Sequence, residues 1–346
     1  MDRKINIVVA WNKLPMYGAV VLKFARKKLN NNFPIISTKS SMPIKEVEEY
    51  LDSNFFTVKN NEETSWANLG LKIPKIFIHS GWGYKHFNSL AYEVKKEGGQ
   101  VVGMFDNNLK WNFRQIIGIF YFRFFLKNRF DGVFVPGIEG VNLARILGFK
   151  YDNIFKYLYT ADDGIFSCRV NIVERPKTFI FIGQLIKRKG IEELINAFNK
   201  FSKINDDWTL KIIGHGELLG LKKNKRISIE PFSPPNYLAN SLNNSRVLIL
   251  PSYEEHWGVV THEAALCGCG LILTKNVGAA TDLARYENSI LINRTSEELI
   301  FDAMKKISNY SEDQFIAMQN RSIEISKEFN KENWTDALMK IIKKYS

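Results

Sequence analysis

The sequence has few cysteines and no long apolar run. Three cysteines among 346 residues, at positions 168, 267 and 269, are too few for a disulfide framework, and one Cys-Gly-Cys pair is a poor zinc site. No uncharged segment approaches the roughly 20 apolar residues that a membrane-spanning helix needs. The chain enters a predicted strand directly after Lys4, so no signal peptide is expected. These absences favour a reduced, cytoplasmic setting.

Two signatures of nucleotide and metal sites are also missing. The first predicted strand, Ile5–Ala10, leads into a loop whose only glycine is Gly18, so the G-x-G-x-x-G pattern of dinucleotide sites is absent. No D-x-D motif stands at the end of a predicted strand. A dinucleotide cofactor is therefore not indicated, and neither is a divalent metal held by such a motif.

The chain is rich in apolar residues and in positive charge. Hydrophobic residues make up 45% and aromatic residues 13% of the chain, which excludes a disordered protein, and 346 residues can form two domains with full cores. The formal net charge of +12 favours an acidic partner: nucleic acid, an anionic membrane or a phosphorylated substrate.

One stretch organises the second half of the sequence. Val247–Leu250 is a short apolar run typical of a buried parallel strand, and a polar loop with Glu255 and Gly258 follows it. A helix is predicted from Val259, and a second buried strand at Leu271–Thr274. Free amide groups at a helix start suit a phosphate, and glycine lets an anion approach the backbone. Carboxylates accept hydrogen bonds from sugar hydroxyls, so the loop predicts a nucleotide-sugar site.

Residues Glu255 to Glu263 resemble the E-x7-E element of retaining GT-B-fold glycosyltransferases, most closely those of family 4. The resemblance implies an α/β chain of two Rossmann-like domains facing a cleft. It places Glu255 at the transferred sugar, Glu263 at the ribose and the loop amides at the diphosphate. The alternative is that Glu255 is a solvated loop acid and Glu263 caps a helix. The donor-binding residues implied in this loop are Glu255, His256, Trp257, Gly258, Val259, Val260 and Glu263.

A second motif resembles the basic diphosphate clamp of the same family. Gly183 and Lys189 stand in a G-x5-K-G spacing after the predicted strand Thr178–Ile182, which implies donor binding by Gly183, Gln184 and Lys189. The family usually has an arginine where this chain has Gln184, and Lys187 or Arg188 could supply the missing cation. The alternative is that Lys189 is an exposed lysine at a helix start.

The first half of the chain supplies the candidate acceptor site. Asp106 and Asn107 follow the predicted strand Val101–Met104, at the carboxyl end where open α/β sheets bind ligands. Family members often have a histidine near the position of Phe105, and this chain does not. An Asx turn that closes the strand is the alternative for Asp106. The implied acceptor-binding residues are Gly18, Asp106 and Asn107, and the implied catalytic residues are Glu255, Lys189 and Asp106.

Leu109–Phe130 combines dense aromatic residues with basic ones and contains no acidic residue. This composition suits a helix lying on anionic lipid, and a core helix with a basic edge is the alternative. The aromatic residues are too contiguous for stacking platforms along a nucleic-acid groove. The basic residues are Lys110, Arg114, Arg123, Lys127 and Arg129.

Together with these features, the resemblance implies a retaining hexosyltransferase. The expected parts are an acceptor-binding domain (1–168), a donor-binding domain (169–330) and a terminal helix (331–346) that packs back on the first domain. No metal ion or cofactor is implied beyond the nucleotide-diphosphate sugar as co-substrate. The expected acceptor is a glycan or lipid-linked glycan of surface-polysaccharide assembly, and no nucleic acid is expected as partner. The expected location is the cytoplasm, at the inner face of the plasma membrane if 109–130 binds lipid.

Three other interpretations stay open. A sugar-nucleotide epimerase of GT-B type would convert the donor without an acceptor. A catalytically inactive scaffold or binding subunit, suggested by Gln184 and by the missing histidine, would release no nucleoside diphosphate. A basic nucleic-acid-binding protein would show salt-dependent retention on DNA or RNA, but the sequence has no motif for it.

Overall fold

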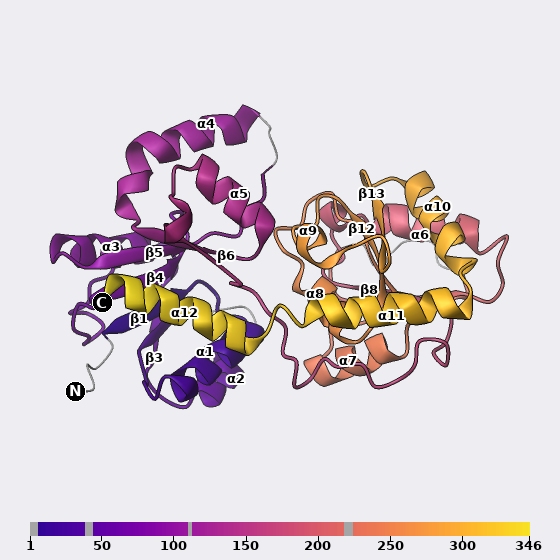
Figure 1. Cartoon of the computed structure of the whole chain (residues 1–346), viewed down its shortest axis with the longest axis horizontal. Helices are drawn as coiled ribbons and strands as arrows, with labels where there is room; N and C mark the ends of the chain where they lie inside the picture. The colour runs from indigo at the N-terminus through magenta and orange to yellow at the C-terminus, as the bar shows by residue number, and fades with distance from the viewer. Residues whose placement is uncertain (1–5, 39–43, 110–112, 218–223) are drawn as a thin grey trace. The chain divides into compact units, whose positions relative to one another are not determined.

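The computed structural model describes residues 6–38, 44–109, 113–217 and 224–346 and divides the chain into two compact units (Figure 1). The first unit comprises Met1–Thr160 and Lys331–Ser346, and the second comprises Ala161–Asn330. Each is an α/β unit with one parallel sheet, which confirms the predicted fold class. Lys110 of the basic aromatic segment lies outside the described residues.

The first unit contains a seven-stranded parallel sheet with the order β3-β2-β1-β4-β5-β6-β7. From β1 the chain proceeds outward to β3, and it then returns to β4 and proceeds outward on the other side to β7. The strands are β1 (Ile7–Trp11), β2 (Ile35–Thr38), β3 (Phe55–Val58), β4 (Ile76–Ser80), β5 (Gln100–Met104), β6 (Gly132–Val135) and β7 (Ile154–Lys156).

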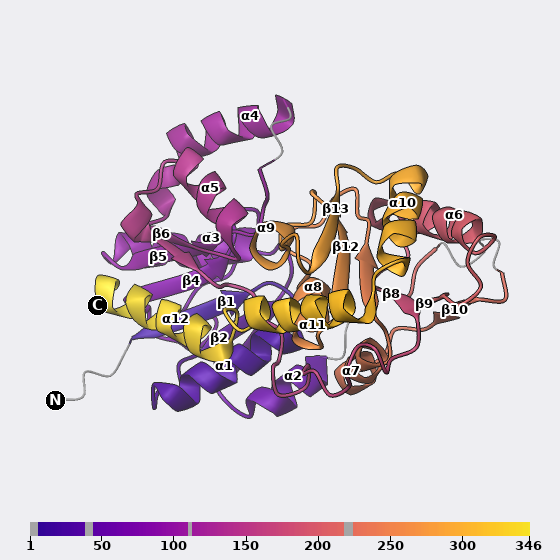
Figure 2. The ribbon, with the colours of Figure 1, turned by 45° about the vertical axis from the view of Figure 1, so that its right-hand side comes forward.

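Helices cover both faces of this sheet because alternate residues of a strand point to opposite sides. In β1, Ile7 and Val9 belong to one apolar core and Val8 to another. Helices α1 and α12 pack side by side on the first core, and α3 and α5 contribute to the second (Figures 1 and 2). The helices are α1 (Met16–Lys28), α2 (Ile44–Leu51), α3 (Lys85–Lys96), α4 (Phe113–Tyr121), α5 (Ile138–Ile146) and α12 (Lys331–Tyr345). Helix α4 continues into the π-helical turn η1 (Phe122–Leu126), and η2 (Lys127–Arg129) and η3 (Tyr151–Asn153) are 3-10 turns.

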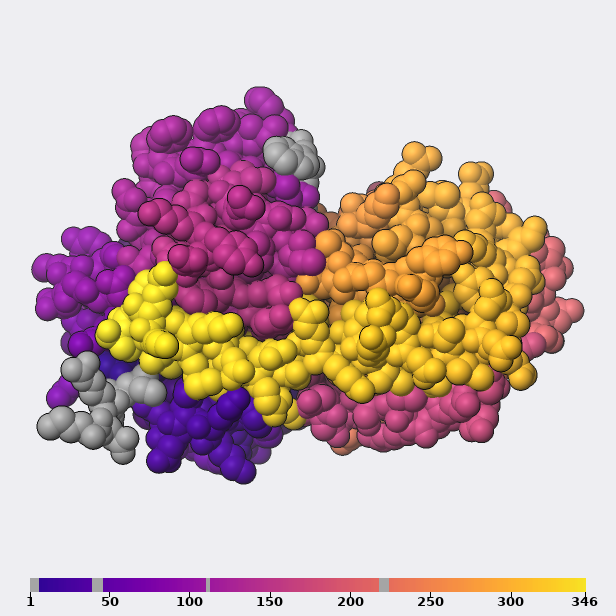
Figure 3. All heavy atoms as spheres, viewed as in Figure 1, coloured from indigo at the N-terminus to yellow at the C-terminus, as the bar shows by residue number. Residues whose placement is uncertain are grey.

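The terminal helix α12 packs on the first unit, where its side chains, drawn in yellow, spread over the surface in Figure 3. The indole Nε1 of Trp334 donates to the carbonyl of Leu158 at 3.0 Å, and the Tyr345 hydroxyl donates to the carbonyl of Asp131 at 2.9 Å. Two side chains at opposite ends of the helix thus hold it against β6 and the segment after β7.

The second unit contains a six-stranded parallel sheet with the order β10-β9-β8-β11-β12-β13. Strands β8, β11 and β12 are buried along their whole length, as continuous apolar runs predict. The strands are β8 (Thr178–Ile182), β9 (Thr209–Ile213), β10 (Ile227–Glu230), β11 (Val247–Leu250), β12 (Gly270–Thr274) and β13 (Ser289–Ile292). The helices are α6 (Ile191–Phe201), α7 (Pro235–Asn243), α8 (Val259–Leu266), α9 (Ala280–Leu283), α10 (Glu297–Ser308) and α11 (Glu312–Ser326), with the 3-10 turn η4 (Lys187–Lys189).

Residues 161–168, expected at the end of the first domain, pack within the second unit. The Ala161 amide donates to Nδ1 of His262 at 2.9 Å. The side-chain amide of Asn243 donates to the carbonyl of Ser167 at 2.9 Å, and its oxygen accepts from the Arg169 amide at 2.7 Å. These bonds hold the segment from Ala161 to Arg169 against α7 and α8. The compact units therefore divide at Thr160 rather than at Cys168.

Candidate active site

The candidate donor site lies in the second unit, at the point where the order of successive strands in the sheet reverses. Strands β8 and β11 are neighbours, and the chain continues from β8 toward β10 on one side and from β11 toward β13 on the other. Open α/β sheets bind ligands at the carboxyl ends of the strands beside such a reversal. The loops that leave β8 and β11 carry both predicted donor motifs, and the fold places them side by side.

A glycine packs the β8 loop against the β11 loop. Gly190 has a φ of +70°, and a Cβ atom at this position would lie 2.4 Å from the carbonyl oxygen of Pro251. A residue with a side chain would therefore force the two loops apart. The Tyr253 amide donates to the carbonyl of Arg188 at 2.8 Å and joins the same loops.

The ammonium group of Lys189 contacts the carboxylate of Glu255 at the junction of these loops. Lys189 is only 8% exposed and the Glu255 side chain only 12%, so neither is a solvated surface residue. Both alternatives, the exposed lysine and the solvated loop acid, are therefore wrong. Arg188 is exposed and lies 3.8 Å from the same carboxylate oxygen. It is therefore a second cation close to Glu255, in a loop that has Gln184 at the position where an arginine was expected.

The backbone of Glu255 is held by the loop that follows β12. Its amide donates to the carbonyl of Asn276 at 3.2 Å, and its carbonyl accepts from the Gly278 amide at 3.0 Å. This short parallel bridge to Val277 fixes the direction of the Glu255 side chain. Sequence reasoning missed this support, because hydrogen bonds between loop backbones carry no residue signature.

Gly258 begins helix α8 in the left-handed region, with a φ of +84°. The Thr261 amide bonds back to the Gly258 carbonyl at 2.8 Å. The remaining amide groups of the first helical turn have no carbonyl within the helix to bond to, which makes this start suitable for an anion. Val259 and Val260, the first two helical residues, are half-buried, so their backbone is their contribution to such a site.

His256 and Trp257, two predicted donor residues, have different surroundings. The Trp257 side chain is 3% exposed and its ring packs 5.3 Å from that of Phe329, so the indole belongs to the core and only its backbone faces the loop. His256 is half-buried, with Nε2 3.3 Å from the carboxylate of Glu254.

Glu263 lies in the middle of α8 and is half-buried. Its position in the helix shows that it is not a capping residue, which corrects that alternative. Burial raises the pKa of its carboxyl group to about 7. At neutral pH this group is therefore divided between the acid and the carboxylate, and a ligand that donates hydrogen bonds to it would favour the carboxylate.

Two glycine turns pack on each other at the ends of β8 and β9. A Cβ atom on Gly214 would lie 1.8 Å from the carbonyl oxygen of Gly183, and the Leu185 amide donates to the carbonyl of His215 at 2.7 Å. Gln184, between Gly183 and Leu185, is exposed. The close packing brings both turns to the same edge of the sheet as Lys189.

The predicted acceptor residues lie in the first unit. Asp106 follows β5, and its carboxylate accepts a hydrogen bond from the Tyr159 hydroxyl at 2.9 Å. The Tyr159 ring lies 5.9 Å from that of Trp11 and 5.8 Å from that of Tyr17. Sequence reasoning missed these three aromatic residues, although Trp11 ends β1 and Tyr159 follows β7, and these strand-end positions were the available signal.

The other two acceptor candidates have simpler positions. Asn107 is exposed beside Asp106. Gly18 lies in the first turn of α1 and is buried, and a Cβ atom there would lie 2.8 Å from a side-chain carbon of Leu14. Gly18 therefore permits the close packing of α1 on the loop that follows β1.

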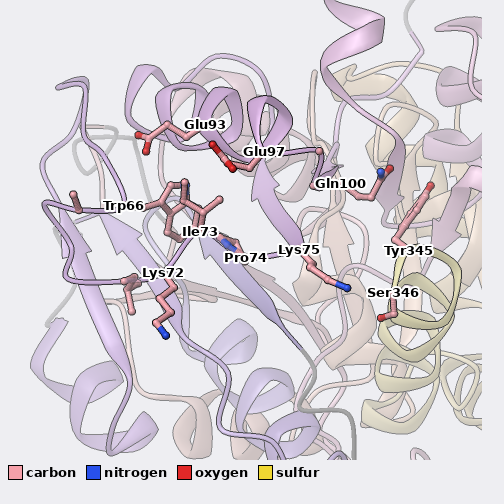
Figure 4. A pocket seen from close by; sticks show the side chains of 14 residues that line it. Trp66, Lys72, Ile73, Pro74, Lys75, Glu93, Glu97, Gln100, Tyr345 and Ser346 are labelled. Carbon is pink, nitrogen blue, oxygen red and sulfur yellow. The ribbon is translucent and has the colours of Figure 1, made fainter.

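The pocket in Figure 4 lies elsewhere in the first unit, at the amino ends of β4 and β5. It has a volume of about 660 Å³, and its lining includes Lys75, Gln100 and Tyr345. Within the described ranges, no group of histidine, cysteine, aspartate and glutamate side chains is arranged to hold a metal ion. Nor does any described helix have the length and apolar character to cross a membrane.

Comparisons with known proteins show a family match in the second unit and a fold match over the whole chain. Residues 166–328 match the family model of glycosyl transferases group 1. Over 160 residues the chain is 24% identical to the 2-deoxystreptamine N-acetyl-D-glucosaminyltransferase of Niallia circulans, a match that covers 44% of this chain and 41% of that protein. Over 139 residues it is 25% identical to the capsular polysaccharide biosynthesis glycosyltransferase CapM of Staphylococcus aureus, covering 37% and 36%. The chain thus matches less than half the length of these curated relatives.

Solved structures resemble the whole chain. Anabaena HepE in complex with UDP has a TM-score of 0.74 at 15% identity, with 98% of this chain and 100% of that chain covered. A glycosyltransferase from Rickettsia africae has a TM-score of 0.72 at 14% identity, with 99% of each chain covered. Residues 166–328 are therefore similar to glycosyl transferases group 1, and the whole chain has the fold of two Rossmann-like domains that its GT-B structural neighbours have.

Proposed function

We propose that the protein transfers a hexose from a nucleotide-diphosphate sugar to a hydroxyl group of a glycan acceptor, with retention of configuration. The observation that carries this proposal is the buried contact between Lys189 and Glu255 beside the start of α8. Lys189 and the amides at the start of α8 suit a diphosphate, and the Glu255 carboxylate suits sugar hydroxyls. Both residues lie in the segment that matches glycosyl transferases group 1.

In this proposal the donor exchanges the partners of two side chains. Before binding, the Lys189 ammonium neutralises Glu255. The diphosphate then takes the ammonium and the amides after Trp257, while the sugar hydroxyls donate to Glu255. Glu263 accepts hydrogen bonds from the ribose diol, and Gly183 and Gln184 line the same edge. This exchange avoids leaving a buried charge without a partner at either stage.

The chemical step breaks the bond between the anomeric carbon and the phosphate oxygen. The acceptor hydroxyl oxygen bonds to the same face of that carbon, and its proton passes to the departing diphosphate. Lys189 and the helix amides stabilise the charge that develops on the diphosphate, a kind of stabilisation that often contributes a factor of about 10²–10³ per group. In this proposal Lys189 and these amides stabilise the diphosphate, and the reaction requires no metal ion or cofactor.

For the acceptor we propose a lipid-linked glycan of surface-polysaccharide assembly, bound by the first unit at the inner face of the plasma membrane. The Asp106 carboxylate would accept a hydrogen bond from the reacting hydroxyl, and the rings of Tyr17 and Tyr159 beside it suit the apolar face of a sugar. The likeness to the capsular polysaccharide glycosyltransferase CapM supports this class of acceptor.

The donor assignment is tested by binding and turnover. A thermal-shift panel of uridine, guanosine and adenosine diphosphates and their sugars identifies the base, because a specific ligand raises the unfolding midpoint. Lys189→Met and Glu255→Gln should each lower donor turnover about 10²–10³-fold. Lys177→Met is the matched control, since Lys177 pairs with Asp207 at 2.7 Å just before the amino end of β8 in the same unit. Equal turnover by Lys189→Met and Lys177→Met would reject the proposed site.

Stereochemistry and cofactor dependence need separate measurements. The proton spectrum of the first product should show the anomeric configuration of the donor. Turnover should persist in EDTA, and conversion of the donor sugar in the absence of any acceptor would favour an epimerase instead.

A further inference from the structure

The segment from Phe113 to Leu126, formed by α4 and η1, has an inner stripe that is mostly apolar and an outer stripe that is wholly apolar. The inner stripe (Gln115, Ile119, Phe122 and Leu126) faces the unit, and its last two members are buried. The outer stripe has the spacing i, i+3, i+4, i+7, i+8, i+11 and i+12, which places its members on one helical face. Its members and their exposed fractions are Phe113 (79%), Ile116 (36%), Ile117 (54%), Phe120 (59%), Tyr121 (55%), Phe124 (74%) and Phe125 (68%).

The outer stripe is a surface of the protein. In both ribbon views α4 is the outermost helix of the first unit, beyond α5 (Figures 1 and 2). The whole of α4 contains no buried residue. Scattered apolar side chains are normal on a protein surface, but a contiguous stripe of this length marks an interaction site.

The charges around the outer stripe identify the partner. Leu109–Phe130 contains no aspartate or glutamate. Arg114, Arg123 and Arg129 are exposed along it, and Arg123 is held in place by a 3.1 Å hydrogen bond to the carbonyl of Ile146. A surface with apolar residues in the middle and arginines along its length complements a bilayer with anionic headgroups.

Two other modes of binding fit this surface less well. Two copies of the outer stripe facing each other would bring their arginines together without any acid from this segment to pair with them, because a twofold interface contacts itself. A membrane-spanning position is also excluded for α4 and η1, since 14 helical residues extend only about 21 Å and a bilayer core is about 30 Å thick.

We propose that the outer stripe of α4 and η1 docks on the surface of an anionic lipid bilayer, with the helix parallel to the membrane plane. The phenyl rings of Phe120 and Phe124 enter the boundary between headgroups and acyl chains, and Arg114 and Arg129 pair with lipid phosphates. This inference extends the proposed function, because it brings the acceptor site of the first unit to the layer where a lipid-linked acceptor lies.

Vesicle flotation tests the surface without turnover. Vesicles of phosphatidylcholine mixed with phosphatidylglycerol should carry the wild-type protein upward at low salt, and vesicles of phosphatidylcholine alone should carry much less. Phe120→Ser combined with Phe124→Ser should weaken the binding about tenfold or more. Arg114→Gln combined with Arg129→Gln should weaken binding to the anionic vesicles about tenfold and reduce its salt dependence.

The matched control replaces exposed aromatic residues elsewhere on the same unit. Tyr92 and Tyr151 are each 72% exposed, and Tyr92→Ser combined with Tyr151→Ser should float as the wild type does. Circular dichroism and donor binding should be unchanged in all variants, which shows that they fold. The proposal is overturned if the wild type does not float with anionic vesicles, if the double phenylalanine variant floats equally well, or if that variant abolishes only a dimer seen by light scattering. Loss of flotation with donor turnover intact would leave the glycosyltransferase assignment standing.

Discussion

The Tyr159 hydroxyl donates a 2.9 Å hydrogen bond to the Asp106 carboxylate, across 53 positions of sequence. Burial and the neighbouring Asp106 charge both raise the pKa of Tyr159 well above its usual value. The phenol therefore remains a proton donor to the Asp106 carboxylate. The pair gives the first unit an oriented carboxylate beside aromatic rings.

If this carboxylate binds the acceptor, Tyr159→Phe should affect the acceptor and not the donor. Removing one hydrogen bond to a charged group typically costs about 1.5–3 kcal/mol, so kcat/KM for the acceptor should fall about 10- to 100-fold while KM for the donor stays constant. Asp106→Asn should have a larger effect in the same direction. Tyr151→Phe, at an exposed tyrosine of the same unit, is the control. Two-substrate kinetics decide the matter, and a rise confined to the donor KM would contradict the assignment of Asp106.

The pKa of Glu263 makes donor binding depend on pH. Burial raises that pKa to about 7 in the empty protein. A ribose diol bonds more strongly to the two oxygens of the carboxylate than to the neutral acid, which has one O–H donor and accepts less well. As the pH rises through about 7 the carboxylate forms, so donor affinity should increase and then level off. One pH unit below the pKa it should be about tenfold weaker. Calorimetric titration with the best-binding nucleotide sugar measures this profile, because its diphosphate diester does not titrate near neutral pH.

Glu263→Gln provides the control for this profile. The amide cannot ionise, so the affinity of the variant should be lower at high pH and nearly independent of pH. If the affinity of the wild type for the donor is constant between about pH 6 and about pH 8, one unit on either side of that pKa, Glu263 does not bind the donor.

Local sequence was sufficient for most of the second unit. Short apolar runs bounded by polar or glycine residues gave β8 and β11 with the bounds that the structure has, and β12 one residue short. In the first unit, β3 (Phe55–Val58) went unpredicted because three of its four residues are partly or fully exposed, which leaves no buried run to recognise. Such an edge strand is defined by its pairing with β2 and not by its own composition.

The sequence predicted individual residues of the site better than it predicted which of them contact one another. Lys189 and Glu255 were both predicted as donor residues, but their contact spans 66 positions and depends on β8 lying next to β11. The pairing of Asp106 with Tyr159 depends in the same way on the order of the strands. Periodicity identifies a strand, whereas the order of parallel strands is decided by long-range packing.

Gly190 should be among the least replaceable residues of the donor site. Its φ of +70° is unfavourable for residues with a side chain, and a Cβ atom would lie 2.4 Å from the Pro251 oxygen and 2.7 Å from a Thr295 methyl carbon. Gly190→Ala should therefore destabilise the protein by about 1–3 kcal/mol and separate Lys189 from Glu255. Gly118→Ala is the control, since Gly118 lies in α4 with open space around it and should gain about 0.5–1 kcal/mol. Urea unfolding of both variants measures the difference, and equal stabilities would contradict the close packing of the two loops.

The buried imidazole of His262 should make the folded protein less stable at acid pH. Its Nδ1 accepts from the Ala161 amide and its Nε2 lies 3.0 Å from the Ser326 carbonyl, which requires the neutral ring with the proton on Nε2. Burial lowers its pKa from 6.5 to about 4, so its contribution is complete above the unfolded pKa and is lost as the pH falls from about 6.5 toward 4, by up to about 3 kcal/mol. His262→Phe should be less stable than the wild type at neutral pH by about 1–3 kcal/mol, because the amide and the carbonyl lose their partner, but its stability should fall less on acidification. Urea unfolding across this pH range measures the free energy of unfolding of both proteins. His215→Gln is the control, because His215 is exposed. The same acid sensitivity in His262→Phe as in the wild type would show that His262 is not its source.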